Sequence, residues 1–257
     1  DGKFEIRDIT VAIVNSAKKH LETLPQHFGH IVVDECHRTP SSMFFEVATA
    51  FESKYMLGLS ATAYRRDGLT KLIYLTLGDR VHEVDPDILK ANGAVMVPEI
   101  IQRQTSFSYP YDDDYQAMFS ALTKDIPRNR QIVTDVVKQA GKGRGTCLMV
   151  SDRVQHCEDL ANLIWEHDLD VEVLTGKTSK AERERIVQDV QAGNVDVLCS
   201  TVQLLGEGFD CSGLSSLFLA TPIKFKGRLL QIVGRILRPA DGKRPVIYNY
   251  NDLNVGV

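Results

Sequence analysis

The feature that most constrains the fold is an alternation of short aliphatic runs with longer stretches of helical periodicity. The short runs are Ile9–Val14, His30–Asp34, Tyr55–Ser60, Arg80–Val84, Val97–Gln102, Thr146–Val150, Val171–Leu174, Val195–Ser200, Leu217–Ala220 and Pro245–Tyr250. The helical stretches between them include Val154–His167, Ser179–Gln191 and Gly227–Leu237. Because this alternation is typical of βαβ units, the sequence predicts an α/β fold with parallel sheets.

The chain length of 257 residues accommodates one or two domains. Pro86 and the Asn92-Gly93 pair interrupt the pattern, so we place a domain boundary near residue 93. The first part, 1–92, then has few strands for a doubly wound domain, whereas the second part, 93–257, has a complete set. The chain begins at Asp1 without a methionine and ends just after a strand-like run. We therefore expect a piece of a longer protein, with a first domain that is incomplete at its N-terminus.

The composition excludes several classes of protein. With 43% hydrophobic and 25% charged residues the chain is typical of globular proteins, and no apolar run is long enough to cross a bilayer. The cysteines are odd in number and form no Cys-x-x-Cys pair, which favours reduced thiols in a cytoplasmic protein over disulfides or zinc. The net charge of -4 excludes a uniformly basic nucleic-acid binder but permits a local basic surface.

Two adjacent carboxylates, Asp34 and Glu35, follow the apolar run Ile31-Val32-Val33. A buried strand that ends there places both acids at the carboxyl edge of a sheet, where α/β proteins bind ligands. One such acid can hold Mg²⁺ through water, and its neighbour can orient or deprotonate an attacking water. Taken alone, an Asp-Glu pair after three aliphatic residues is more often a polar strand end without a function.

Two further polar segments also follow predicted strands. Ser60-Ala61-Thr62 offers two hydroxyls that can couple the carboxylate strand to its neighbours, although hydroxyls commonly cap helices as well. Gly206-Glu207-Gly208-Phe209-Asp210 combines glycines, which permit close approach to a sugar-phosphate, with an acid that can accept from a ribose hydroxyl or bind a basic group. The simpler alternative for this second segment is a turn closed by small residues.

The sharpest segment is Gln231-Ile232-Val233-Gly234-Arg235-Ile236-Leu237-Arg238. Arg235 and Arg238 share one face of a predicted helix, with Gln231 on the same side. Two guanidiniums aimed together suit a triphosphate, whose negative charge redistributes during γ-phosphoryl transfer. A basic helix end that complements the dipole is the alternative, and Pro239 does end a helix here. A basic end alone, however, does not require Gln231 and Gly234.

In this order, the four segments resemble motifs II, III, V and VI of superfamily 2 helicases. The stretch Leu57–Gly68 is similar to the DEAD/DEAH-box group that includes type III restriction subunits and repair helicases of the xeroderma pigmentosum B type. Ile9–Ser16 resembles motif Ib, with Ile13 where the family tends to have threonine, and Leu148–Ser151 resembles motif IV. The resemblance implies two RecA-like domains: 1–92 is the later part of the first, with motifs Ib, II and III, and 93–257 is the second, with motifs IV, V and VI.

The resemblance also implies a role for each matching residue, with ATP and Mg²⁺ as cofactors. Asp34 would hold Mg²⁺ through water, and Glu35 would be the catalytic base. The other implied catalytic residues are Gln231 and the arginine fingers Arg235 and Arg238, and the other implied nucleotide contacts are His37, Gly208 and Asp210. The residues implied to couple the two activities are Ser60 and Thr62. The implied nucleic-acid contacts are Ser151, Thr175, Gly176 and Thr201.

Such an enzyme also needs a Gly-x-x-x-x-Gly-Lys-[Ser/Thr] loop before the carboxylates, and residues 1–33 carry none. Gly176-Lys177-Thr178 is the only Gly-Lys-Thr in the chain, but Val171 stands where the first glycine of the loop belongs. We therefore interpret Gly176–Thr178 as unrelated to ATP and expect the 257-residue chain to lack ATPase activity.

The resemblance and a basic segment at 222–244 together predict a nucleic-acid partner, with DNA favoured over RNA. A solvated basic stretch is the alternative for this segment. The leading hypothesis is a fragment of an ATP-dependent DNA helicase or translocase, cytoplasmic and without membrane contact. The alternatives are a protein that binds nucleic acid or a partner without hydrolysing ATP, and the motor subunit of a restriction-modification complex. Protein partners of a repair or restriction complex fit the first and last of these.

Overall fold

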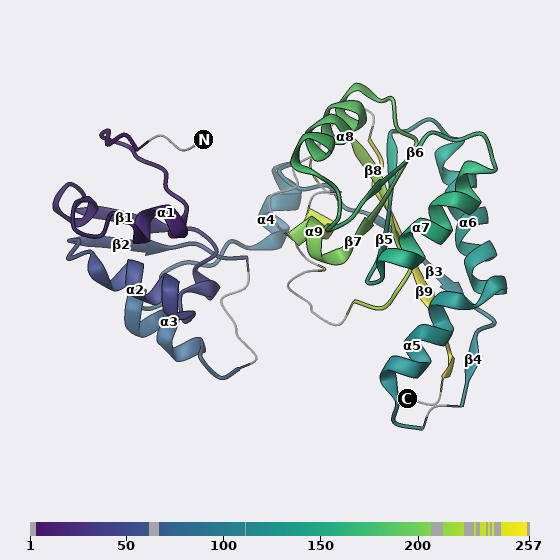
Figure 1. Cartoon of the computed structure of the whole chain (residues 1–257), viewed down its shortest axis with the longest axis horizontal. Coiled ribbons are helices and arrows are strands. Elements are labelled where there is room, and N and C mark those ends of the chain that lie inside the picture. Colours follow the sequence, from purple (N-terminus) through teal and green to yellow (C-terminus); the bar gives the residue numbers. More distant parts are fainter. Residues whose placement is uncertain are drawn as a thin grey trace. The chain divides into compact units, whose positions relative to one another are not determined.

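The computed structural model describes residues 4–61, 67–110, 112–206, 213–223, 229, 232–234, 236, 238 and 243–255, without the side chains of 86, 205 and 206. The described chain forms two compact units, Asp1–Val84 and Asp85–Val257 (Figure 1). The division lies between Val84 and Asp85, upstream of the boundary that we placed near residue 93. Each unit is described by itself below.

The first unit is built on two parallel strands, β1 (His30–Val33) and β2 (Tyr55–Gly58), paired from His30↔Tyr55 to Val33↔Gly58. Its helices are α1 (Val14–Lys18), the 3₁₀ turns Leu24–Gln26 and Cys36–Arg38, α2 (Ser42–Ala50) and α3 (Thr70–Leu77). The strands predicted at Ile9–Val14 and Arg80–Val84 are wrong, because neither segment pairs with another strand. The side chains of Ile9, Val11 and Ile13 are instead exposed.

The second unit contains a six-stranded sheet of order β3-β9-β8-β5-β7-β6, in which every pairing is parallel. This arrangement confirms the predicted α/β class. Its strands are β3 (Glu99–Gln104), β5 (Thr146–Ser151), β6 (Val171–Leu174), β7 (Val197–Thr201), β8 (Leu214–Leu219) and β9 (Val246–Asn251). A short parallel pair, β4 (Ser108–Tyr109) with β10 (Asn254–Val255), was not predicted.

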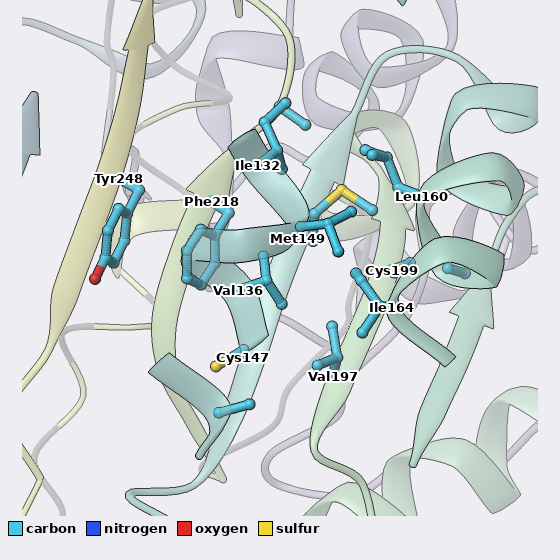
Figure 2. Close-up of a cluster of buried hydrophobic side chains, with 14 of the residues drawn as sticks. Ile132, Val136, Cys147, Met149, Leu160, Ile164, Val197, Cys199, Phe218 and Tyr248 are labelled. Carbon is cyan, nitrogen blue, oxygen red and sulfur yellow. The ribbon is translucent and has the colours of Figure 1, made fainter. Parts of the chain in front are cut away.

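The helices of the second unit are α4 (Pro86–Ala91), α5 (Tyr115–Lys124), α6 (Ile126–Ala140), α7 (Val154–Trp165), α8 (Lys180–Ala192) and α9 (Val202–Gly206). Helices α6 and α7 cover one face of the sheet, where Met149, Phe218 and Tyr248 pack against Ile132 and Leu160 (Figure 2). Helix α8 covers the other face, where Ile186 and Val190 pack with Leu148 and Val150. These two β5 side chains point to the face opposite to that of Met149. The central strands are apolar on both sides because both faces are covered.

The cysteines of the described chain support the expectation of reduced thiols. Cys36, Cys147, Cys157 and Cys199 are free and buried, and burial raises the thiol pKa of Cys147 to about 11 and that of Cys157 to about 12. Cys211 lies outside the described residues. Among the described helices, none combines the length and the apolar character needed to cross a membrane.

Candidate functional site

The turn after β1 carries the two predicted carboxylates at the carboxyl edge of the β1–β2 pair. Glu35 adopts a left-handed conformation with φ 49° and ψ 47°, and its backbone N–H donates to Asp34 Oδ1 at 2.8 Å. For a residue other than glycine, such a backbone costs of order 1–3 kcal/mol, and it is often found at functional sites. The left-handed residue turns the chain directly from the strand into the 3₁₀ turn Cys36–Arg38.

Backbone hydrogen bonds join this turn to the end of the neighbouring strand. Leu59 N–H donates to the carbonyl of Val33 at 2.9 Å, and Cys36 N–H donates to the carbonyl of Leu59 at 2.8 Å. The pairing of the strands thereby continues past β2 and brings Ser60 beside His37. His37 Nδ1 lies 3.0 Å from Ser60 Oγ and 3.1 Å from Glu35 Oε2. One imidazole nitrogen therefore lies close to both the predicted catalytic base and the predicted coupling hydroxyl.

A glycine permits the close packing beneath this turn, and sequence reasoning did not single it out. A Cβ at Gly58 would lie 2.9 Å from Leu77 Cδ1 and 3.1 Å from both Cβ and Sγ of Cys36. Real Cβ atoms essentially never come closer than 3.0 Å, so a side chain at position 58 would require the Leu77 side chain to shift and Cys36 to move by a few tenths of an ångström. Cys36 is buried, and its burial raises the pKa of its thiol.

The donor set at this edge fits Mg²⁺ held by one protein carboxylate. Magnesium commonly takes one or two carboxylates, with waters and substrate phosphates as its other ligands. Asp34 supplies such a carboxylate, and Glu35 and His37 lie beside it. In the described parts of the chain, no cluster of three or more His, Cys, Asp or Glu side chains forms a complete metal cage. At this edge Asp34 would supply one ligand, and water or a bound phosphate would supply the others.

The structure brings together four of the five predicted residues of the first unit: Asp34, Glu35, His37 and Ser60. The fifth, Thr62, lies outside the described residues, as do Gly208, Asp210, Gln231 and Arg235 in the second unit. Arg238 is described and exposed, and its carbonyl accepts a hydrogen bond from Lys243 Nζ at 2.9 Å.

The predicted nucleic-acid residues lie in one row across adjacent strands of the second unit. Ser151 at the end of β5 is in register with Thr201 at the end of β7. Leu174 of β6 is in register with Ser200, so Thr175 follows at the same level. The sequence did not indicate that these side chains are buried, but Ser151, Thr175 and Thr201 are 0%, 5% and 7% exposed. Their phosphate contacts stay predictions, and Gly176 is the exposed member of the set.

The Gly-Lys-Thr segment forms a small turn closed by its own hydrogen bonds. Thr175 N–H donates to Thr178 Oγ1 at 3.0 Å, and Lys177 N–H donates to Thr175 Oγ1 at 3.3 Å. Thr178 N–H donates to the carbonyl of Thr175 at 3.0 Å. A phosphate loop directs successive backbone amides at its ligand, whereas three amides of this turn are already used within it.

Sequence reasoning missed a buried ion pair at the same edge of the sheet. Arg128 is 0% exposed, and its Nε donates to Asp252 Oδ1 at 2.8 Å while Nη1 donates to the carbonyl of Ala220 at 2.7 Å. Asp252 also accepts from the hydroxyl of Thr105. These contacts tie the first turn of α6 to the ends of β8, β9 and β3. No local pattern signals the pair, because its two partners are distant in sequence.

Comparison with known proteins places both units. The family model "Helicase conserved C-terminal domain" matches residues 129–240, and the model "Type III restriction enzyme, res subunit" matches residues 2–65. The DNA 3'-5' translocase XPB2 of Sulfurisphaera tokodaii is 24% identical over 276 residues, which cover 93% of this chain and 62% of that protein. The chain spans about half the length of the curated relatives that it matches.

Two solved structures share the fold. A fragment assigned as the HsdR subunit of a type I restriction enzyme from Vibrio vulnificus has a TM-score of 0.68 at 21% identity, with 88% of this chain and 44% of that chain covered. Dbp5 of S. cerevisiae, bound to RNA and ADP BeF3, has a TM-score of 0.59 at 13% identity, with 87% and 53% covered. The six-stranded parallel sheet is thus RecA-like. The two family models cover the segments that carry the motifs, and in both segments the chain is similar to helicases and restriction subunits.

Proposed function

We propose that this chain forms part of an ATP-dependent motor, a helicase or translocase, that couples ATP hydrolysis to movement on DNA. The observation that carries the proposal is the position of His37 Nδ1, within 3.1 Å of Glu35 Oε2 and 3.0 Å of Ser60 Oγ. A base for water and a hydroxyl on the next strand then share one partner. A change in nucleotide at the carboxylates can therefore move the segment after β2.

Each unit supplies a different part of the proposed chemistry. When bound, Mg²⁺ and ATP would supply the activated phosphate, with Asp34 holding the ion through water. Glu35 would orient the attacking water and accept its proton. Arg235 and Arg238 of the second unit would neutralise the charge that develops on the transferred phosphoryl group.

The proposal is tested by measuring phosphate release by the intact protein with and without nucleic acid. We expect single- or double-stranded DNA to raise the rate, and RNA of the same sequence to raise it less. Binding to phosphates should make the stimulation fall as salt rises. Equal rates with and without nucleic acid would contradict coupling. A larger effect of RNA would support a motor that moves on RNA instead of DNA. The similar proteins include both kinds, since XPB2 is named a DNA translocase and Dbp5 is bound to RNA.

The 257-residue chain itself should release phosphate no faster than a buffer blank. It has no Gly-x-x-x-x-Gly-Lys-[Ser/Thr] sequence, and the turn around Lys177 uses its amides internally. We propose that the phosphate loop of the motor comes from sequence outside these residues. Turnover by this chain that Lys177→Ala abolishes would show instead that the Gly-Lys-Thr segment binds the nucleotide.

A second candidate is a protein that binds nucleic acid without hydrolysing ATP, and the missing phosphate loop favours it. Intact protein that binds DNA but releases no phosphate would support this candidate over the motor. The match to the type III restriction model, together with the likeness to HsdR, supports a restriction complex as the partner if the motor is confirmed. Co-purification with a methyltransferase or nuclease subunit would test that assignment.

A further inference from the structure

A chain of buried hydrogen bonds runs beneath the carboxyl end of β5. His156 on α7 is 1% exposed, with Nδ1 2.9 Å from Ser151 Oγ and Nε2 2.9 Å from Asn129 Oδ1. Asn129 lies on α6, and its Nδ2 donates to the carbonyl of Thr123 at 2.9 Å. The imidazole is thus held between two helices and the end of a central strand.

These contacts fix where each hydrogen lies. Because Asn129 uses its amide N–H on a carbonyl, its Oδ1 accepts from His156 Nε2–H. Burial and the nearby positive charge of Arg128 lower the pKa of His156 to about 3, so the ring is neutral at neutral pH. A neutral ring protonated at Nε2 has an acceptor at Nδ1, which takes the hydroxyl hydrogen of Ser151. The single donor of Ser151 is therefore used inside the protein.

The turn that follows Ser151 also has its backbone amides occupied. Arg153 N–H donates to Ser151 Oγ at 3.2 Å, and Asp152 N–H donates to Thr221 Oγ1 at 2.9 Å. This turn presents the exposed side chains of Asp152 and Arg153 to solvent, and Arg153 is the basic one. Its guanidinium lies 5.1 Å from the ring centroid of Phe119 and donates to Gln116 Oε1, both on α5.

We propose that Arg153, and not Ser151, makes the phosphate contact at the end of β5, and that His156 is a positioning residue that acts through Ser151. This inference rests on the proposed nucleic-acid function and names a contact within it. His156 holds the Ser151 hydroxyl with its lone pairs toward Arg153 N–H, which fixes the backbone from which the Arg153 side chain leaves. Phe119 and Gln116 then hold the guanidinium, so that less rotamer entropy is lost on binding.

The test measures binding of a fluorescently labelled single-stranded DNA oligonucleotide to the 257-residue chain over a range of salt concentrations. Arg153→Gln should weaken binding about tenfold, the size of one charge-assisted hydrogen bond. It should also reduce the slope of log affinity against log salt by about 0.7, as expected for one lost phosphate contact on a single strand. Arg144→Gln is the matched control, because Arg144 is exposed at the opposite end of β5 and should change neither quantity.

The positioning role has its own readout. His156→Leu should weaken binding and lower the salt slope, whereas His156→Asn, which retains an acceptor near Nδ1, should restore both. If His156 acts through Arg153, the double variant Arg153→Gln with His156→Leu binds as Arg153→Gln does alone. Should His156→Leu fail to fold by circular dichroism, Ser151→Ala replaces it in the same cycle.

Three results would contradict these assignments in different ways. An unchanged affinity and salt slope for Arg153→Gln, with normal binding by the unaltered chain, would overturn the contact but leave the proposed function intact. Additive losses in the double variant would overturn the positioning role of His156. Absence of any binding by the unaltered chain would contradict the proposed function and the contact with it.

Discussion

Glu35→Gln should lower nucleic-acid-stimulated phosphate release by the intact protein about 10²- to 10⁴-fold, the usual contribution of a general base. Glutamine has nearly the same shape as glutamate, so it should retain the left-handed turn after β1 and the contact with His37. It lacks the basic oxygen that takes the proton from water. Binding of nucleotide and of DNA should therefore change little while turnover is lost.

The control for this prediction is Glu52→Gln, the same substitution at an exposed site just before β2, at the amino end of the strands. We expect its rate to match that of the unaltered protein. A Glu35→Gln variant within about twofold of the unaltered rate would assign the base to another residue. Loss of nucleotide binding in that variant would show instead that Glu35 is needed to hold the ligand.

Arg128→Met should destabilise the second unit by about 3–5 kcal/mol, the usual cost of removing one partner of a buried ion pair. Asp252, with a side chain only 8% exposed, would keep its charge without the guanidinium that now pairs with it. The carbonyl of Ala220 would lose its donor as well. Urea unfolding followed by far-UV circular dichroism measures the loss.

Two comparisons separate charge from packing in this experiment. Arg130→Met changes an exposed arginine on the same helix and should alter stability by less than about 0.5 kcal/mol. Adding Asp252→Asn to Arg128→Met removes the uncompensated charge and retains an acceptor for Thr105. We expect this double variant to recover much of the lost stability. A double variant no more stable than Arg128→Met would indicate that the arginine contributes mainly by filling space.

The fold could be predicted well where a strand is both apolar and central. The predicted strand Thr146–Val150 lies within the central strand β5, because apolar strands buried on two faces have a strong local pattern. Ile9, Val11 and Ile13 also belong to an apolar run, yet their side chains are 70–96% exposed and their backbone has no strand partner. A strand forms only by pairing with a neighbouring strand, and the local sequence does not show whether such a neighbour is present. The two-residue strands β4 and β10 are too short to leave a pattern at all.

The candidate site was predictable in its chemistry and less so in its geometry. Motif order identified Asp34, Glu35, His37 and Ser60, and the structure brings them together. The sequence did not indicate that the hydroxyl of Ser151 would be directed inward, because its partner His156 belongs to a helix whose rotation depends on packing. Burial directs the hydroxyl of Ser151, a residue that matches a motif, into the protein.

The strand order of the second unit also has a consequence for synthesis on the ribosome. Strand β3 is the first of the described sheet to be made, but its partner among the described strands is β9, the last. Asn249 Nδ2 donates to Gln102 Oε1 across 147 residues of sequence. At roughly 5–20 residues per second, β3 waits about 7–30 s for its partner. During that interval the backbone edge that will pair with β9 is free and Ile100 is exposed, so the nascent chain is open to misassembly until its sheet is complete.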